Sequence, residues 1–480
     1  MVWLQEFRSS ESFVVATVST AIFTDLFIYV MIVPIMPTAL VDRIGASEKD
    51  VQLWVSILLA VYGGSILLGS QLKINLHTIA FFGYFADHCK QRQLPFVVGL
   101  VALTASTGLF ALARSFPVLI VARALQGLSA AAVWIVGLSI IADNVPSERV
   151  GEAMGYTTVA LSWGSLLGPA LGGIMYDKVG FHGAFIVPVC LLVADVIMRF
   201  AMIETKKSTQ VDDSSCNETH SSSASEPESA TKIFPYLSPD EQTPLLGPSK
   251  SEVNIGQIER KASVTVFRLL RSPRLPLALA TIVMISIVIS SLDATLPLFV
   301  IEKFNWSPSG AGLIFTVPAV ASFSTIYIAE YASKIGPRIL GAAGFILVAI
   351  SWFLMQLVQH NTTNDIVLLA VILAVLGASI STVQMIAMTE VSYAVEEHEA
   401  EFPGAFGDKP PIAQAYALFN MGLAGGQLLG PVIAGAIRVH AGWSGLMITL
   451  GACCGLMSLP LLLFRQRTIE STENQTEESA

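Results

Sequence analysis

The stretch Gly151–Asp177, GEAMGYTTVALSWGSLLGPALGGIMYD, decides the fold of this chain. It is mostly apolar and long enough to cross a bilayer, yet it carries several glycines and a proline, which ordinary helices avoid. Gly164, Gly168 and Gly172 recur every four residues and form one narrow stripe along a helix. Small residues in such a stripe let a second helix approach closely in lipid, where packing holds helices together. The stretch therefore predicts a membrane-spanning helix that packs tightly on a neighbour.

The spacing of these residues is more specific than their composition. The full pattern is G-x8-G-x3-G-P-x2-G-G, formed by Gly155, Gly164, Gly168, Pro169, Gly172 and Gly173. The proline frees a carbonyl inside the helix and makes the helix bendable. The pattern resembles the antiporter motif in the fifth helix of major facilitator proton-coupled exporters. The alternative interpretation is a plain small-residue face for helix dimerisation.

The composition indicates a membrane protein. The chain has 480 residues, of which 53% are hydrophobic and 13% charged, so it is too apolar for a soluble protein and long enough for several spans. The net charge of −9 comes largely from tails and loops, so we expect no nucleic-acid partner. The five cysteines have neither metal-ligand spacing nor the pattern of a disulfide framework. We therefore expect no metal and no cofactor.

Apolar windows of about 20 residues predict twelve membrane-spanning helices. The first six cover 13–37, 51–70, 95–113, 117–142, 152–176 and 183–203. The second six cover 275–300, 309–331, 338–358, 365–390, 412–436 and 443–464. The predicted fold is an all-α membrane protein with two pseudo-symmetric six-helix bundles, at 1–203 and 273–464. A cytoplasmic tail, 465–480, follows the second bundle.

Matching pieces of sequence recur in the two halves. The pattern Gly426-x3-Gly430-Pro431-x2-Ala434-Gly435 repeats the glycine motif in the eleventh predicted helix. GYFADHCKQR at 83–92 follows the second helix, and AEYASKIGPR at 329–338 follows the eighth. Repeats at matching places imply two related bundles, as in major facilitator folds.

The segment 204–272 between the halves is rich in Ser, Glu, Thr and Pro and has almost no hydrophobic periodicity. It cannot bury enough apolar surface to fold alone, so it is predicted to be a disordered linker. Lys and Arg are concentrated in this linker and in the loops on the same side. The positive-inside rule then places both termini and the linker in the cytosol.

The loop after the second helix contains Gly83, Asp87, Lys90 and Arg92. It resembles the loop between the second and third helices of the major facilitator superfamily, although the family pattern expects Arg and Gly where this chain has His88 and Gln91 nearby. The resemblance implies that Asp87 meets helix ends and cationic side chains and latches the outward-facing state. The alternative is a solvated basic loop without a gating role.

Asp25, Asp293 and Arg123 are ionisable residues within apolar spans, where a charge is costly unless it is paired or hydrated. Asp25 has no basic neighbour at helical spacing, so it is a candidate to bind and release a proton or to hold a cationic amine. Asp293 lies at a similar depth in the seventh helix. The alternative for Asp25 is a structural carboxyl bonded to local hydroxyls such as Thr24. Arg123 lies in RALQG, which resembles the fourth-helix motif of proton-driven antiporters; the alternative is a snorkelling residue.

Further motifs resemble those of vesicular amine transporters and of fungal twelve-span drug–proton antiporters. The chain departs from the amine carriers at two places: Gly63 stands where they have a lysine in the second helix, and Asn420 stands where they have a carboxylate in the eleventh. Because an asparagine cannot titrate, we expect a broader exporter rather than a neurotransmitter carrier. The matching motifs are Asp25 with VPIMP, RALQG, the antiporter motif, LVAD ending at Asp195, Asp293 with TLP, and YALFN at 416–420.

We therefore predict a secondary transporter, not an enzyme, that exchanges protons for a small organic compound such as a drug, toxin, amine or secondary metabolite. The alternatives are a proton-coupled importer or facilitator and, in another class, a non-transporting receptor on a carrier fold. The chain is expected to act as a monomer in the lipid bilayer. The predicted substrate pocket is formed by Asp25, Tyr29, Trp134, Trp163, Tyr416 and Asn420.

The linker also contains an acidic dileucine pattern with Glu241, Leu245 and Leu246. Exposed in a disordered segment, this pattern is of the kind that sorting adaptors read, and it also arises by chance. We expect the plasma membrane or a vacuolar or vesicular membrane as the location.

Overall fold

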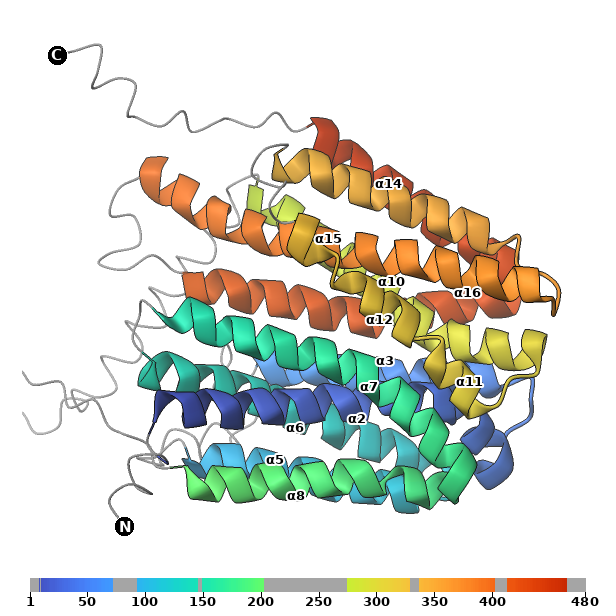
Figure 1. The fold of residues 1–480 in the computed structure, drawn as a ribbon, viewed down its shortest axis with the longest axis horizontal. Coiled ribbons are helices and arrows are strands. Elements are labelled where there is room, and N and C mark those ends of the chain that lie inside the picture. The colour runs from blue at the N-terminus through green and yellow to red at the C-terminus, as the bar shows by residue number, and fades with distance from the viewer. Residues whose placement is uncertain are drawn as a thin grey trace, which may run out of the picture.

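The structure is a computed structural model that describes residues 8, 10–71, 93–145, 149–202, 274–328, 336–401 and 412–463. Long helices run side by side along one direction (Figure 1). The first half comprises α2 (Glu11–Ile44), α3 (Val51–Gln71), α5 (Gln93–Leu112), α6 (Phe116–Asn144), α7 (Val150–Ala184) and α8 (Ile186–Ala201). The second half comprises α10 (Arg274–Phe304), α11 (Pro308–Leu313), α12 (Thr316–Ser322), α14 (Pro337–Met355), α15 (Thr363–Glu401) and α16 (Ile412–Leu463).

Two glycines divide the longest helical stretches into separate spans. Gly180 interrupts α7 at φ 83° and ψ −179°, and Gly442 interrupts α16 at φ 70° and ψ −171°. Residues with a side chain rarely adopt this conformation, so glycine makes the corner at both places. The corners separate the fifth span from the sixth and the eleventh from the twelfth, which is the same position in each half.

With these corners, the helices account for the twelve spans expected from the sequence. Within the described residues, nine helical stretches are long and apolar enough to cross a membrane, and Leu418–Leu463 contains two spans. The helices α5 and α8 are shorter, while α11 and α12 belong to one interrupted span, Pro308–Ile328. Because the number of crossings is even, the chain starts and ends on one side, here called the terminal side. The other side is called the far side.

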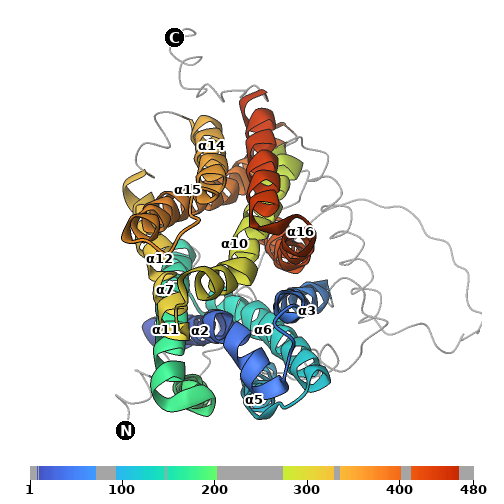
Figure 2. The same cartoon turned by 90° about the vertical axis from the view of Figure 1, so that its right-hand side faces the viewer.

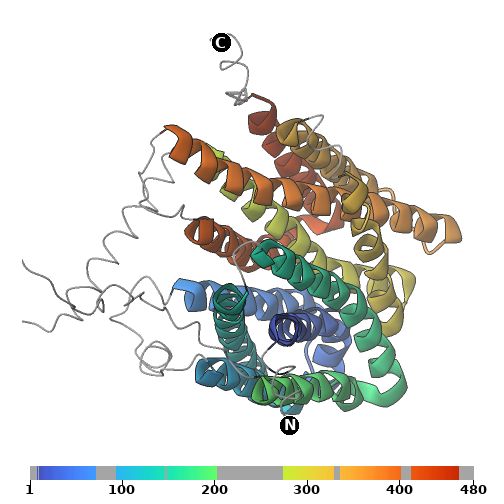
Figure 3. The same cartoon turned by 60° about the vertical axis from the view of Figure 1, so that its left-hand side comes forward.

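The two halves face each other through α2, α3 and α7 of the first half and α10, α11, α12 and α16 of the second. Figure 2 shows the first half in the lower part of the molecule and the second half above it. In these contacts α2 meets α10 and α11, α3 meets α10 and α16, and α7 meets α11 and α12. The contact of α7 with α11 is also visible in Figure 3. Alternating access in such an arrangement requires these contacts to change.

The glycine stripe of α7 packs against α2. A methyl group added at Gly164 would lie 3.1 Å from the carbonyl oxygen of Phe23, and one at Gly168 would lie 3.0 Å from that of Phe27. At Gly172 the same group would lie 2.6 Å from the carbonyl oxygen of Met31. The small residues therefore allow backbone-to-backbone contact along the first helix, as the sequence predicts.

The remaining motif residues do not share this contact. A methyl group at Gly173 would overlap the carbonyl oxygen of Pro308 in α11, and one at Gly312 of α11 would overlap the carbonyl oxygen of Pro169. These two glycines therefore form a contact between the halves. Gly155 has nothing within 4 Å of its added methyl position.

The repeated motif in α16 packs on α10 in the same way and adds hydrogen bonds. A methyl group at Gly430 would lie 2.7 Å from the carbonyl oxygen of Ile287. Three serines of α10 donate to carbonyl oxygens of α16: Ser286 to Leu423 at 2.6 Å, Ser290 to Gly426 at 3.0 Å and Ser291 to Gly430 at 3.2 Å.

Candidate functional site

The site contains one buried carboxylate from each half. Asp25 of α2 is 3% exposed and Asp293 of α10 is 7% exposed. Trp134 donates its indole N–H to Asp25 at 2.9 Å, and the Tyr62 hydroxyl lies 3.4 Å from both carboxylate oxygens. Thr24 instead donates its hydroxyl to the carbonyl of Thr20, at 2.9 Å. The hydrogen-bond donors of Asp25 are therefore side chains of other helices, not the local hydroxyl considered from the sequence.

A pair of tyrosines connects the two carboxylates. Tyr29 donates its hydroxyl to Asp293 at 3.3 Å, which makes a hydrogen bond between the halves. The rings of Tyr29 and Tyr62 stack with centroids 4.8 Å apart and an interplanar angle of 25°. We call Asp25, Tyr62, Tyr29 and Asp293 the tyrosine bridge. In the described part of the chain, neither carboxylate forms an ion pair with a lysine or arginine.

Arg123 lies beside the bridge without touching its carboxylates. Its guanidinium is fully buried, 5.6 Å from the ring centroid of Tyr62 and 5.2 Å from that of Phe110. It donates to Gln126 at 3.3 Å, while its Nε and Nη2 atoms find no hydrogen-bond partner among the described residues. A cation over aromatic faces is stabilised by the ring quadrupole. Arg123 is therefore held partly by aromatic rings, rather than by the acidic partner that its location suggests.

The structure brings together only some of the predicted pocket residues. Asp25, Tyr29 and Trp134 meet at the bridge. Trp163 is 47% exposed, and its ring lies 6.4 Å from that of Phe323, directly after α12. The other two, Tyr416 and Asn420, lie on α16. Asn420 is exposed, and the Tyr416 side chain lies outside the described residues.

Sequence reasoning missed Tyr62. The resemblance drew attention to Gly63, which stands where the amine carriers have a lysine, but a methyl group on Gly63 would lie 2.6 Å from the backbone of Gln427 in α16. Gly63 is thus a close contact between the halves, and the adjacent Tyr62 points to Asp25. A tyrosine in the middle of an apolar span, directly before two glycines, was the available signal.

Hydrogen bonds close the far side of the molecule between the halves. The backbone N–H of Ser309 in α11 donates to Asp177 of α7 at 3.1 Å. Arg438 of α16 donates to Gln52 of α3 at 2.7 Å. Together with the packing of Gly173 on Pro308, these contacts indicate a conformation with its far side shut.

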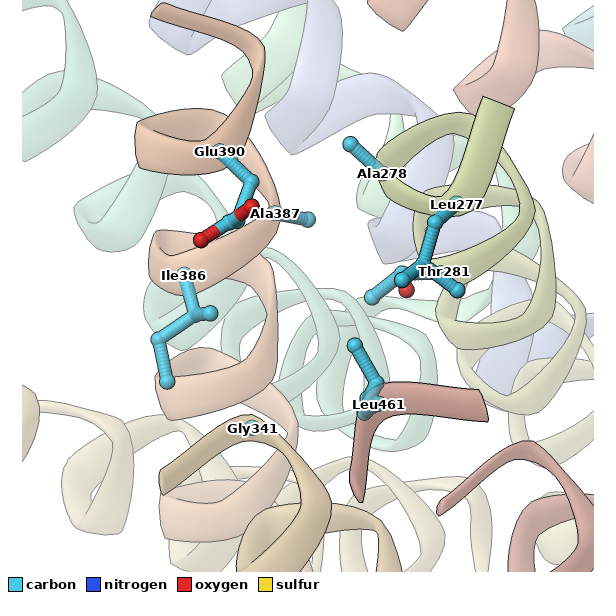
Figure 4. Close-up of a pocket in the computed structure, with 8 residues that line it drawn as sticks. All are labelled: Leu277, Ala278, Thr281, Gly341, Ile386, Ala387, Glu390 and Leu461. Carbon is cyan, nitrogen blue, oxygen red and sulfur yellow. The ribbon is translucent and has the colours of Figure 1, made fainter. Parts of the chain in front are cut away.

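A small pocket inside the second half does not belong to this site. Figure 4 shows its lining, which comes from α10, α14, α15 and α16 and includes the carboxylate of Glu390. That carboxylate pairs with Arg274 at 3.2 Å and with Arg338 at 3.3 Å, so it holds three helices together on the terminal side. The pocket is apolar apart from Glu390 and Thr281, and the Glu390 carboxylate is already paired with two arginines.

Several predicted residues lie outside the described part of the chain. They are the gating-loop residues Gly83, Asp87, Lys90 and Arg92, the sorting residues Glu241, Leu245 and Leu246, and the segments 204–272 and 465–480.

Comparison with known families decides the kind of protein. The model of the Major Facilitator Superfamily matches residues 18–407. The chain belongs to the Major Facilitator Superfamily. It is therefore a multi-pass membrane transporter rather than an enzyme, with a small-molecule substrate.

Relatives of this facilitator cover most of its length. An uncharacterized MFS-type transporter of Schizosaccharomyces pombe is 31% identical over 95% of both chains. The MFS-type transporter ppzB of Metarhizium rileyi is 26% identical over 96% of both chains. The synaptic vesicular amine transporter of Bos taurus is 24% identical over 83% of this chain and 65% of its own. The relatives are thus fungal MFS-type transporters and a vesicular amine transporter.

A solved structure confirms the facilitator fold. The crystal structure of D-xylose-proton symporter aligns with a TM-score of 0.65, covering 96% of this chain and 98% of that one at 13% identity. At this identity the likeness shows the fold alone.

Proposed function

We propose that this facilitator is a proton-coupled antiporter that exports or sequesters a small, hydrophobic or cationic organic compound. The tyrosine bridge carries the proposal, because it connects a buried carboxylate of one half with a buried carboxylate of the other. A buried carboxylate without a paired cation is a site where a proton or a cationic ligand can supply the missing charge.

The bridge offers a physical link between protonation and the arrangement of the halves. Hydrogen bonds to an ionised carboxylate are about twice as strong as those between neutral groups. Protonation of Asp293 therefore weakens its bond with Tyr29, which is a bond between the halves. A substrate that binds near Asp25 must bind the two conformations unequally to drive the cycle.

The antiporter motif supports exchange over import, since Gly173 and Pro169 lie at the contact between α7 and α11. The importer, the facilitator and the receptor remain distinguishable by one experiment. Purified protein in proteoliposomes is given a fluorescent lipophilic cation, and proton flux is recorded together with dye movement. Antiport moves protons against the direction of the dye, and symport moves both together. A facilitator moves dye without protons, and a receptor moves neither.

The hydroxyls of the bridge can be tested one at a time. Tyr29→Phe keeps the ring stack and removes the bond to Asp293, so we expect dye accumulation driven by a pH gradient to fall about fivefold, the equivalent of about 1 kcal/mol. Tyr62→Phe should have a similar or smaller effect, because Trp134 still donates to Asp25. Tyr327→Phe is the control, since Tyr327, which follows α12 in the chain, is exposed and outside the bridge. Full accumulation by both bridge variants would contradict a role of the hydroxyls.

We further propose a vacuole-like membrane as the location and a cytosolic face for the linker. Leu245→Ala with Leu246→Ala should move the protein to the cell surface, because the change removes the apolar part of the acidic dileucine pattern. Fluorescence microscopy of tagged protein checks the location, with Leu237→Ala in the same linker as the control. An unchanged distribution of the double variant would count against sorting by this pattern.

A further inference from the structure

Arg438 is a cation whose side chain is 10% exposed and whose hydrogen bonds lie at the meeting of three helices. Its Nη1 atom donates to the side-chain oxygen of Gln52 at 2.7 Å and to the carbonyl of Thr295 at 2.9 Å. Its Nη2 atom donates to Glu302 at 2.7 Å. The guanidinium also lies 5.7 Å from the ring centroid of Trp443. Neither the antiporter motif nor the tyrosine bridge includes these contacts.

The side-chain amide of Gln52 forms hydrogen bonds beside Arg438 through both its nitrogen and its oxygen. Its side-chain N–H groups donate to the carbonyl of Ala294 at 3.1 Å and to the hydroxyl of Ser56 at 3.1 Å, while its oxygen accepts from Arg438. Gln52 belongs to α3 of the first half, whereas Ala294 and Arg438 belong to the second. The side chain therefore forms two hydrogen bonds across the boundary between the halves.

The carbonyls that these side chains hold follow Asp293 directly in α10. Pro297, four residues after Asp293, has no N–H, so the Asp293 carbonyl lacks its helical partner. The helical turn that carries Asp293 therefore lacks one of its backbone hydrogen bonds. Gln52 and Arg438 donate to the next two carbonyls, at Ala294 and Thr295.

We propose that Gln52 and Arg438 form a clasp that positions the Asp293 turn and holds the far side closed. The clasp consists of Gln52, Arg438 and the carbonyls of Ala294 and Thr295. When the halves part on the far side, the bonds of Gln52 to Arg438 and Ala294 break. The bonds of Arg438 to Thr295 and Glu302 stay within the second half. Opening therefore releases the carbonyl of Ala294 from Gln52, while the carbonyl of Thr295 stays bonded to Arg438.

The clasp is a positioning device because neither side chain touches the bridge carboxylate through a hydrogen bond. Its link to transport rests on the proposed function, but its effect on far-side closure does not. Losing a charge-assisted hydrogen bond shifts an equilibrium about tenfold or more. We expect the population open on the far side to rise by that order when the clasp is removed.

The test measures access to the interface beneath the clasp and needs neither substrate nor proton gradient. Ser56 is buried against Gly435 of α16, so Ser56→Cys places a thiol between the halves. The native cysteines are first replaced by serine. A membrane-impermeant maleimide is then added to the far side of sealed membrane vesicles, and the labelling rate is measured by gel shift.

We expect Gln52→Leu and Arg438→Gln to raise the labelling rate about tenfold, as the clasp bonds between the halves are lost. Arg438→Lys should raise it less, because the cation remains but the fork that reaches Gln52 and Thr295 together is gone. Glu302→Gln is the control: Glu302 is 56% exposed and contacts Arg438 only within the second half. Its labelling rate should stay at the parent value.

Two results would overturn the proposal. One is a parental labelling rate in folded Gln52→Leu and Arg438→Gln, with folding checked by size-exclusion chromatography and thermal melting. The other is an equal rise in Glu302→Gln, which would assign closure to the exposed ion pair instead. If the clasp variants label faster but wild-type protein moves no protons, the clasp stands and the proposed antiport fails.

Discussion

Asp25→Asn should reach its membrane and lose the accumulation of substrate driven by a proton gradient. Asparagine keeps the size of the side chain and an oxygen that accepts from Tyr62 and Trp134, but it fixes the charge at zero. A buried neutral amide also costs less than a buried carboxylate without a cation. A gradient of one pH unit is worth about 1.4 kcal/mol per proton, or about tenfold accumulation, and this factor should disappear.

The measurement compares accumulation in vesicles with and without an imposed pH gradient. Exchange of substrate for substrate should persist in the variant, because that process moves no net proton. Asp195→Asn is a matched control, since Asp195 of α8 is only 1% exposed and lies outside the bridge. Full gradient-driven accumulation by Asp25→Asn would remove Asp25 from the coupling role and point to Asp293.

Gly173→Ala should abolish most transport, whereas Gly155→Ala should be tolerated. The added methyl group at Gly173 would overlap the backbone of Pro308, and neither backbone can move without separating α7 from α11. Overpacking of this kind costs about 1–3 kcal/mol, which is about a five- to hundredfold shift away from the closed far side. The rate of transport should fall accordingly.

The control separates this contact from a general effect of alanine in a helix. Alanine favours a helix over glycine by about 1 kcal/mol, and this gain applies at both positions. Only Gly173 has a neighbour within reach of the methyl group. The initial rate of dye transport is measured per amount of protein in the membrane. Equal rates for Gly173→Ala and wild type would show that the far-side contact does not limit the cycle.

The sequence predicts the spans and the close packing of the glycine stripe of α7 well, because both depend on local pattern. A run of about twenty apolar residues predicts a membrane span. Glycines four residues apart predict a closely packed neighbouring helix. The corner at Gly180 falls in the gap predicted between the fifth and sixth spans, and Gly442 falls in the equivalent gap before the twelfth.

The site is predicted less well, because contacts between distant helices have no local pattern. Asp25 stands out as a carboxylate in an apolar span, but nothing near it in the sequence indicates that Tyr62 and Trp134 donate to it. Trp163 has the right residue type, yet the turn of α7 directs it to Phe323 rather than to Asp25. Arg438 escaped notice because it follows the predicted end of the eleventh span and resembles an ordinary interfacial cation.

The serines between α10 and α16 have a mechanical consequence. Hydrogen bonds require particular distances and angles, so the bonds of Ser286, Ser290 and Ser291 fix the register of these two helices. The glycine stripe of α7 carries no side-chain donor, and bonds between α2 and α7, such as Ser19–Thr157 and Tyr176–Asp42, lie beyond its two ends. The seventh and eleventh spans are thus fixed rigidly to each other. The first and fifth spans can instead slide along their contact.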